Sequence, residues 1–296
     1  MKRIFLALAL FCNQHDANSQ NQIRFNPSPI IRKWTTAIIN IEVRNRNIVS
    51  SGTAIFLSYK DRNYLLTARH ILYDPFSRDT NKITDKMILI ENLTQRDIAD
   101  KYDSARKTYT WIGDYHFLLF SLKQGNRPAY LFSSIQEDLA VIDLSQEIMG
   151  QSFANTLYKR GYRPIFIRDI DTICNINDGD KVMALGFPME SEVDTNKIGP
   201  LLDYRSRFIS IPILSDGTTN RYSDGPYFGA NMFLYHGFSG GPIIRNNKLI
   251  GIIHGYNLQL NQSLSPEIPY YREFQLQIIR SSYIMLLLRT FEVTRL

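Results

Sequence analysis

Short apolar segments separated by turn residues make up most of the chain. They are rich in Ile, Val, Phe and Tyr, a composition that favours strands over helices. In the first half, strands are predicted at residues 37–43, 52–58, 62–67, 87–91, 111–121 and 139–144. In the second half, they are predicted at residues 181–185, 204–213, 241–245 and 248–256. Many short strands with few helices indicate an all-β barrel or sandwich.

The end of the chain has a different pattern. From Glu273 onward, apolar residues recur close to helical spacing, at Phe274, Leu276, Ile278, Ile279, Tyr283, Leu286 and Leu287. Arg280 and Arg289 interrupt this pattern, so it predicts a docked C-terminal helix rather than a membrane span. No linker rich in Pro, Gly or Ser divides the chain, and residues 74–130 are predicted to be loop insertions around strands.

Composition and charge exclude several classes of protein. The chain has 296 residues, of which 44% are hydrophobic and 21% charged, which excludes a disordered, collagenous or disulfide-scaffold protein. The net charge of +6 is not gathered into a dense Lys/Arg block, so no nucleic-acid partner is expected. Cys12 and Cys174 are the only cysteines, too few for a metal cluster or a disulfide framework. We therefore expect no metal and no cofactor.

Residues 1–19 predict a secretory signal peptide. Lys2 and Arg3 precede an apolar run over residues 4–11, and polar and small residues follow as far as Ser19. Such a run cannot span a bilayer, which needs about 20 apolar residues, whereas its flanks are typical of a signal peptide. Cleavage after Ser19 predicts a periplasmic or secreted protein, with residues 20–35 as an N-terminal extension.

Two other interpretations of this first segment stay open. Cys12 directly follows the apolar run and would be the acylated residue of a lipoprotein, although the bulky Phe11 beside it disfavours that reading. The segment could also form a buried N-terminal strand.

Residues 237–242, Gly-Phe-Ser-Gly-Gly-Pro, carry the strongest local signal for chemistry. Glycines on both sides of Ser239 let the backbone turn tightly, so the hydroxyl is presented and nearby amides can converge on one oxygen. The spacing also fits the nucleophile elbow of α/β-hydrolases, but that elbow runs directly into a helix. Pro242 and the hairpin pattern that follows it predict strands at this point instead.

Two further motifs place an imidazole and a carboxylate at strand ends. His70 follows an apolar strand, and Asp138 directly precedes another, Leu-Ala-Val-Ile. Histidine suits a general base because its unperturbed pKa lies near neutrality, and a neighbouring carboxylate can fix its tautomer. Asp143, at the far end of the second strand, is a rival for this carboxylate, although it faces the opposite side of the strand.

The order along the chain is His70, Asp138, Ser239, whereas an α/β-hydrolase would have its serine first and its histidine last. The blocks Thr-Ala-Arg-His, Asp-Leu-Ala-Val-Ile-Asp and Gly-Phe-Ser-Gly-Gly-Pro resemble the three signature blocks of the trypsin/chymotrypsin-like serine proteases. The mid-chain stretch from Asn177 to Pro188 is similar to that of the bacterial members, which include the high-temperature-requirement proteases and the glutamyl endopeptidases. The resemblance covers about residues 36–290.

This resemblance implies a fold and a set of roles. The fold would be two six-stranded antiparallel barrels with a C-terminal helix, the boundary near residues 150–170 and the site in the cleft between the barrels. Ser239 would be the nucleophile, His70 the base and then the acid, and Asp138 the residue that orients His70. The backbone amides of Gly237 and Ser239 would form the oxyanion hole.

The resemblance also predicts residues that bind substrate. Phe233 stands where trypsin-type enzymes have an aspartate, so cleavage after Arg or Lys is disfavoured and a small or apolar side chain is preferred. His254, Gly255 and Tyr256 lie in the strand whose edge would bind substrate backbone. His254 would either line the specificity pocket or hydrogen-bond Asp138. Glutamate-specific relatives have their histidine one residue earlier, at Ile253, so glutamate specificity is disfavoured.

Two positions depart from the family pattern. Phe238 stands where animal digestive members have an aspartate, so we expect a buried ring to order this loop without zymogen cleavage. Arg69 stands where alanine is usual, and we expect it to face solvent or the cleft.

The predicted function is a secreted serine endopeptidase that acts on proteins or peptides through an acyl-enzyme. We expect a monomer, since the fold consumes the residues after Ser239 and leaves no room for an appended peptide-binding domain. An inactive pseudo-protease that binds peptides is the main alternative, and an esterase with the same triad is the other.

Overall fold

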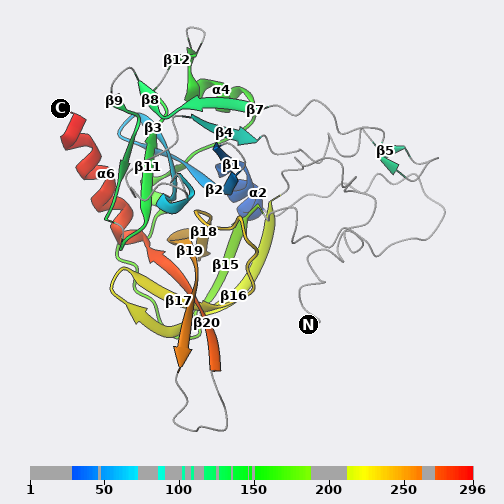
Figure 1. The fold of residues 1–296 in the computed structure, drawn as a ribbon, viewed down its shortest axis with the longest axis vertical. Coiled ribbons are helices and arrows are strands. Elements are labelled where there is room, and N and C mark those ends of the chain that lie inside the picture. Colours follow the sequence, from blue (N-terminus) through cyan, green and yellow to red (C-terminus); the bar gives the residue numbers. More distant parts are fainter. Residues whose placement is uncertain are drawn as a thin grey trace.

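The computed structural model describes residues 29–45, 48–72, 86–90, 102–103, 108–109, 117–124, 127–134, 136–145, 147–148, 151–187, 212–261 and 271–295. The predicted signal peptide, residues 1–19, lies outside these ranges. The described residues form two sheets and a C-terminal helix (Figure 1).

The first sheet is a half-barrel in the order β10-β11-β3-β2-β1-β4-β7, with β14 added parallel to β2. Its strands are β1 (Ile38–Asn45), β2 (Ile48–Tyr59), β3 (Arg62–Ala68), β4 (Lys86–Ile90), β7 (Phe117–Ser121), β10 (Tyr130–Phe132), β11 (Leu139–Asp143) and β14 (Ile165–Phe166). The end strands β7 and β10 do not pair with each other in the described part of the chain, so the first of the two predicted barrels is described as a half-barrel. The chain between them makes a separate hairpin, β8 (Lys123–Gln124) with β9 (Arg127–Pro128).

The second sheet is a closed barrel in the order β15-β16-β17-β20-β19-β18, which confirms the second predicted barrel. Its strands are β15 (Lys181–Gly186), β16 (Ile213–Asp224), β17 (Tyr227–Asn231), β18 (Pro242–Arg245), β19 (Lys248–Asn261) and β20 (Tyr271–Arg280). Two more hairpins lie outside both sheets, β5 (Tyr102–Asp103) with β6 (Thr108–Tyr109) and β12 (Glu147–Ile148) with β13 (Gln151–Ser152). The chain leaves the first sheet at β14 and enters the second at β15.

The C-terminal segment differs from its prediction. Residues from Glu273 to Arg280 belong to strand β20, and only Ser281–Arg295 form the predicted terminal helix, α6. Leu276 and Ile278 pack inside the barrel, while Ile279 on the other face packs against the first sheet and α6. A strand that is buried on both faces gives a near-continuous apolar run, which periodicity alone does not distinguish from a helix.

Other boundaries also differ from the sequence prediction. Strand β16 begins at Ile213, where the predicted strand over residues 204–213 was to end, and residues 204–211 lie outside the described ranges. Helices α2 (Pro29–Ala37) and α4 (Phe153–Lys159) were not predicted, nor were the single turns η1 (Arg69–Leu72) and η2 (Ile167–Asp169). None of the helices that the structure describes has the length and apolar character to cross a membrane.

Three apolar clusters hold the fold together. One lies within the first sheet around Phe56 and Phe120, and another lies within the barrel around Phe228 and Phe238. The third draws its members from both sheets and from α2 and α6, with Trp34 fully buried in it. Since both sheets contribute to this shared cluster, loops of one are held in a fixed position against loops of the other.

Candidate active site

His70 and Asp138 meet because their strands are neighbours. Strand β3 ends at Ala68, which pairs with Leu139, the first residue of β11. Arg69, the residue after β3, and Asp138, the residue before β11, therefore lie side by side, and His70 follows directly after Arg69. His70 Nδ1 lies 2.7 Å from Asp138 Oδ2, and the backbone amide of His70 donates to Asp138 Oδ1 at 2.9 Å. Because an ionised carboxylate only accepts, this contact fixes the proton on Nδ1 and leaves Nε2 as the base.

Asp138 adopts a backbone conformation that other contacts must hold. Its φ of 49° is in the left-handed region, which is costly for a residue with a side chain. The amide of Arg69 donates to the Asp138 carbonyl at 2.8 Å, and the amide of Leu139 donates to Ser133 Oγ at 2.8 Å. These hydrogen bonds fix the loop from Ser133 to Leu139 against the start of η1.

We expected Arg69 to face solvent or the cleft, but its side chain is buried. It is 6% exposed, its guanidinium donates to the Ser133 carbonyl at 2.6 Å, and it lies 4.9 Å from the centre of the Phe132 ring. The aromatic face offsets the cost of burying the cation. Arg69 therefore holds the loop that carries Asp138.

The carboxyl of Asp138 is ionised despite its burial. Burial alone would raise its pKa, but the hydrogen bonds from His254 and His70 outweigh this effect and hold the pKa below its usual value. Asp143, the rival carboxylate, is fully buried elsewhere on β11, opposite Tyr64, and one of its oxygens accepts from the amide of Ser145 at 2.7 Å. The structure thus brings Asp138, and not Asp143, to His70.

Ser239 lies in the loop between β17 and β18. The amide of Phe238 donates to the Tyr235 carbonyl at 3.2 Å, which closes a turn with Gly237 at φ 93°, a value that favours glycine. The Phe238 ring is 1% exposed and packs within the barrel, as the sequence predicted. A neutral, buried ring therefore anchors the residue immediately before the serine.

Thr53 of β2 joins this loop to the first sheet. Its hydroxyl donates to the Gly237 carbonyl at 2.9 Å, and its amide donates to the Ser239 carbonyl at 2.8 Å. The same hydroxyl oxygen accepts from the amide of Phe187 at 3.1 Å. Gly240 must be glycine here, because a Cβ at that position would lie 2.1 Å from the Thr53 carbonyl oxygen. Sequence analysis missed Thr53, since one buried threonine in an apolar strand gives no pattern.

The Ser239 hydroxyl does not contact His70 in this structure. It donates to the backbone carbonyl of His254 at 3.0 Å, and no hydrogen bond joins it to His70 in this structure. Within the described part of the chain, the amides of Gly237 and Ser239 donate no hydrogen bonds. Hydrogen bonds of this kind often form only in the complex with substrate.

A second imidazole contacts the same carboxylate. His254 Nδ1 lies 2.6 Å from Asp138 Oδ2, and the rings of His254 and His70 meet edge to face at 5.5 Å. Tyr227 of β17 covers the His254 ring at 5.3 Å, and its hydroxyl donates to the Gln136 carbonyl. Burial, and to a lesser extent the Asp138 charge, raise the pKa of Tyr227 to about 12.

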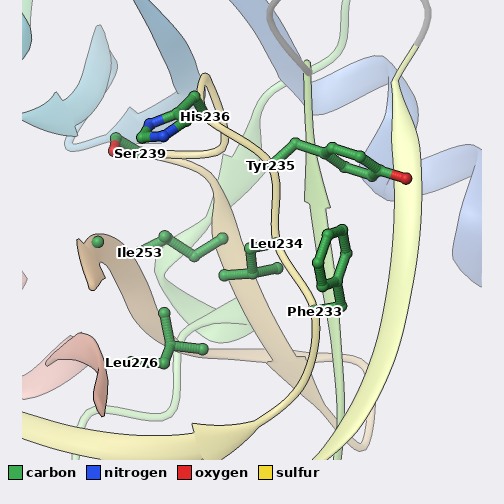
Figure 2. A pocket seen from close by; sticks show the side chains of 8 residues that line it. Phe233, Leu234, Tyr235, His236, Ser239, Ile253 and Leu276 are labelled. Carbon is green, nitrogen blue, oxygen red and sulfur yellow. The ribbon is translucent and has the colours of Figure 1, made fainter. Parts of the chain in front are cut away.

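A cavity of about 490 Å³ opens beside Ser239. Figure 2 shows apolar side chains along it, with Ser239 and His236 together at one end. Its lining residues are Phe233, Leu234, Tyr235, His236, Ser239, Ile253, Gly255 and Leu276. Phe233 and Gly255 line this cavity, whereas the His254 ring turns to Asp138, the second role considered for it. The side chain of Tyr256 lies outside the described residues.

His70, Asp138 and His254 each offer one possible metal ligand atom, all within 4.8 Å, and they form the one such group found among the described residues. Two ligands of a tetrahedral zinc ion, each about 2.0–2.1 Å from the metal, are about 3.3 Å apart. The nitrogen–oxygen distances here are 2.6 and 2.7 Å, which are those of hydrogen bonds. We therefore treat the group as a hydrogen-bonded cluster.

Two packed β sheets, with a histidine–carboxylate pair on one and a serine in a glycine-rich loop on the other, define a chymotrypsin-like peptidase fold. The profile of the trypsin-like peptidase domain matches residues 52–252, and the chain belongs to this family. No curated protein matches the chain.

Solved structures give distant likenesses. An inactivated protease paralogue of the scabies mite, S-D1, has a TM-score of 0.50 and 11% identity, over 88% of this chain and 94% of its own. The serine endoprotease from Yersinia pestis has a TM-score of 0.48 and 16% identity, over 88% of this chain but only 64% of its own length. Because the scabies mite protein is an inactivated protease, its likeness supports the fold and says nothing of activity.

Proposed function

We propose that the protein is a serine endopeptidase that works through an acyl-enzyme on Ser239. The observation that carries this proposal is the pairing of His70 Nδ1 with the buried Asp138 carboxylate at 2.7 Å, beside a serine whose loop has two backbone amides that donate to no described residue. Each part has a place in acyl transfer: a base, a group that orients it, a nucleophile and donors for an oxyanion.

The reaction begins when the Ser239 hydroxyl turns from the His254 carbonyl toward His70. Ser239 Oγ attacks the peptide carbonyl while His70 Nε2 accepts its proton, and the oxygen that becomes negative is bound by the amides of Gly237 and Ser239. His70 then gives the proton to the leaving amine. In the second half, His70 deprotonates a water, which releases the acyl group and restores Ser239.

The edge of β19 is the proposed binding place for the substrate backbone. Strand β18 pairs with β19 only as far as Ile252, whereas β20 pairs with β19 as far as Asn261. Among the described residues, no strand pairs with the β18-side edge of β19 after Ile253, and we propose that an extended peptide adds to this edge as a strand. The His254 carbonyl, freed when Ser239 turns, is the first acceptor on that edge.

The cavity indicates which side chain precedes the cleaved bond. Phe233, Leu234, Ile253 and Leu276 give it apolar walls, and none of its lining residues is acidic. We propose a small or apolar side chain at this position. We further propose that the enzyme acts in the periplasm or outside the cell, on the basis of the signal-like residues 1–19.

Labelling with a fluorophosphonate probe tests the reaction directly. The full chain should be labelled, should cleave peptides after small or apolar residues, and should lose both properties in Ser239→Ala. If short acyl esters are cleaved and peptides are not, the esterase is the correct function.

One observation favours the alternative, a pseudo-protease that binds peptides without cleaving them. Ser239 Oγ is held by the His254 carbonyl at 3.0 Å rather than by His70. If this contact persists with substrate, no proton transfer follows. The chain would then bind apolar peptides in calorimetry, with no labelling and no cleavage, and the enzyme proposal would be wrong.

A further inference from the structure

The imidazole of His254, the second histidine on the Asp138 carboxylate, has no part in the steps described above, which use only the backbone carbonyl of this residue. His254 comes from β19 of the barrel, whereas His70 and Asp138 come from the first sheet. Its ring is brought to Asp138 by an irregularity in the sheet, because the β19–β20 register shifts between Ile253 and Gly255 and leaves His254 without a partner residue. Such a bulge re-aims a side chain.

The two imidazoles compete for one negative charge. His70 Nδ1 and His254 Nδ1 both lie at hydrogen-bond distance from the same oxygen, Asp138 Oδ2, so each ring carries its neutral-state proton on Nδ1. Each ring can take one further proton, on Nε2. Once one ring is a cation paired with Asp138, protonation of the other is disfavoured, because the carboxylate charge is already neutralised.

We propose that His254 is a positioning residue that shares the Asp138 carboxylate with His70, so that a proton held by His254 keeps His70 neutral and extends activity to lower pH. The inference rests on the proposed peptidase function of this site. His254 is not among the described residues that line the cavity, and its side chain acts through Asp138.

The groups that face His254 support this assignment. Among the described residues, the titratable side chains in contact with its ring are Asp138 before β11, His70 on η1 and Tyr227 on β17. Tyr227 stays neutral over the range in which histidine titrates, because its pKa is about 12. Glu137 and Asp224 act on Tyr227 rather than on the His254 ring. His254 is 29% exposed and His70 is 40% exposed, so both can exchange protons with solvent.

The acid limb of the pH profile separates this role from a structural one. In the wild type, kcat/KM should fall in two steps on the acid side, because the first proton is shared between His254 and His70. The variant His254→Asn keeps a donor for Asp138 but cannot take the extra proton. The activity of this variant should fall in a single step, about one pH unit higher than in the wild type, and its KM at pH 8 should be unchanged.

Two further variants complete the test. His254→Ala removes both the donor and the titrating group, so kcat at pH 8 should fall about tenfold, and His254→Asn should restore it. Tyr227→Phe removes the hydroxyl of a neighbour that does not titrate in this range, and its acid limb should match that of the wild type. If the limbs of wild type and His254→Asn superimpose, the proposal is wrong.

A measurement without turnover keeps this inference separate from the proposed function. The sequence has five histidines, so imidazole signals can be followed by nuclear magnetic resonance with labelled histidine. Replacing His254 by Asn should let His70 take up its proton at a higher pH than in the wild type. If the wild type is inactive at every pH but this shift is seen, the peptidase proposal fails and the shared carboxylate stands. An unchanged His70 titration overturns the inference, whatever the activity.

Discussion

The two sheets contribute to the site in different ways. The first sheet supplies His70 and Asp138 from adjacent strands, and two hydrogen bonds join these residues. The barrel supplies Ser239 from a loop, and that hydroxyl is hydrogen-bonded to the barrel's own His254 carbonyl. In the proposed reaction, His70 is thus oriented before substrate binds, whereas the Ser239 hydroxyl has to turn toward it.

The contacts that cross between the sheets explain how these halves act together. Thr53 of the first sheet holds the backbone of Gly237 and Ser239, and His254 of the barrel holds the carboxylate of Asp138. Each sheet therefore positions a group that belongs to the other. Substitutions on either side should separate the chemistry of the serine from the orientation of the base.

The largest effect is expected at the nucleophile. Ser239→Ala should lower kcat by about 10⁵–10⁶, because the residues of a triad act as a unit. The fold should persist, since the loop is tied to Thr53 through the Ser239 backbone, which the substitution keeps. Peptide cleavage and thermal unfolding measured on the same sample check both statements. A variant that retained a tenth of the wild-type rate would exclude Ser239 as the nucleophile.

The next effect concerns the acid that orients His70. Asp138→Asn should lower kcat by about 10⁴, because an amide permits the wrong tautomer of His70. Asp143→Asn is the matched control on the same strand: it is fully buried but bonded to the amide of Ser145. That control should lower the melting temperature and leave kcat within a few-fold. If it reduces kcat more than Asp138→Asn does, Asp143 is the acid.

The features predicted best from the sequence are those that depend on a local pattern of residues. His70, Asp138 and Ser239 stand out because each lies at the end of an apolar strand or between glycines, and the first and third signature blocks fall at β3 and before β18 as expected. The apolar pattern from Glu273 predicts a helix where strand β20 lies, because both faces of this strand are buried. Thr53 and the contact of His254 with Asp138 depend on how the two sheets pack and on a bulge in β19, which a single sequence does not display.

A smaller effect is expected at the tie between the sheets. Thr53→Val keeps the shape of the side chain but removes the donor to the Gly237 carbonyl and leaves the Phe187 amide without its acceptor. The free energy of unfolding should fall by about 1–3 kcal/mol, and kcat about tenfold, because the amides of the Ser239 loop lose their fixed position. Denaturant unfolding and kinetics measure the two effects.

The control for Thr53 is Thr290→Val on α6, whose hydroxyl donates only within its own helix, to the Leu286 carbonyl. It should leave both quantities nearly unchanged. Equal loss of kcat in the two variants would mean that Thr53 does not hold the serine loop.

The smallest effect is expected at Arg69, which contacts the loop that carries Asp138. Arg69→Ala removes the hydrogen bond to the Ser133 carbonyl and the contact with the Phe132 ring, so the loop that keeps Asp138 at positive φ loses one support. The free energy of unfolding should fall by about 1–2 kcal/mol.

Arg221→Ala is the matched control, because the side chain of Arg221 is 90% exposed and its ion pair with Asp178 lies at the surface. Denaturant unfolding of both variants measures the difference, and equal stabilities would show that Arg69 does not hold this loop. Ser239 lies on the barrel, away from the contacts that Arg69→Ala removes. The substitution should therefore slow fluorophosphonate labelling only by disturbing the orientation of His70.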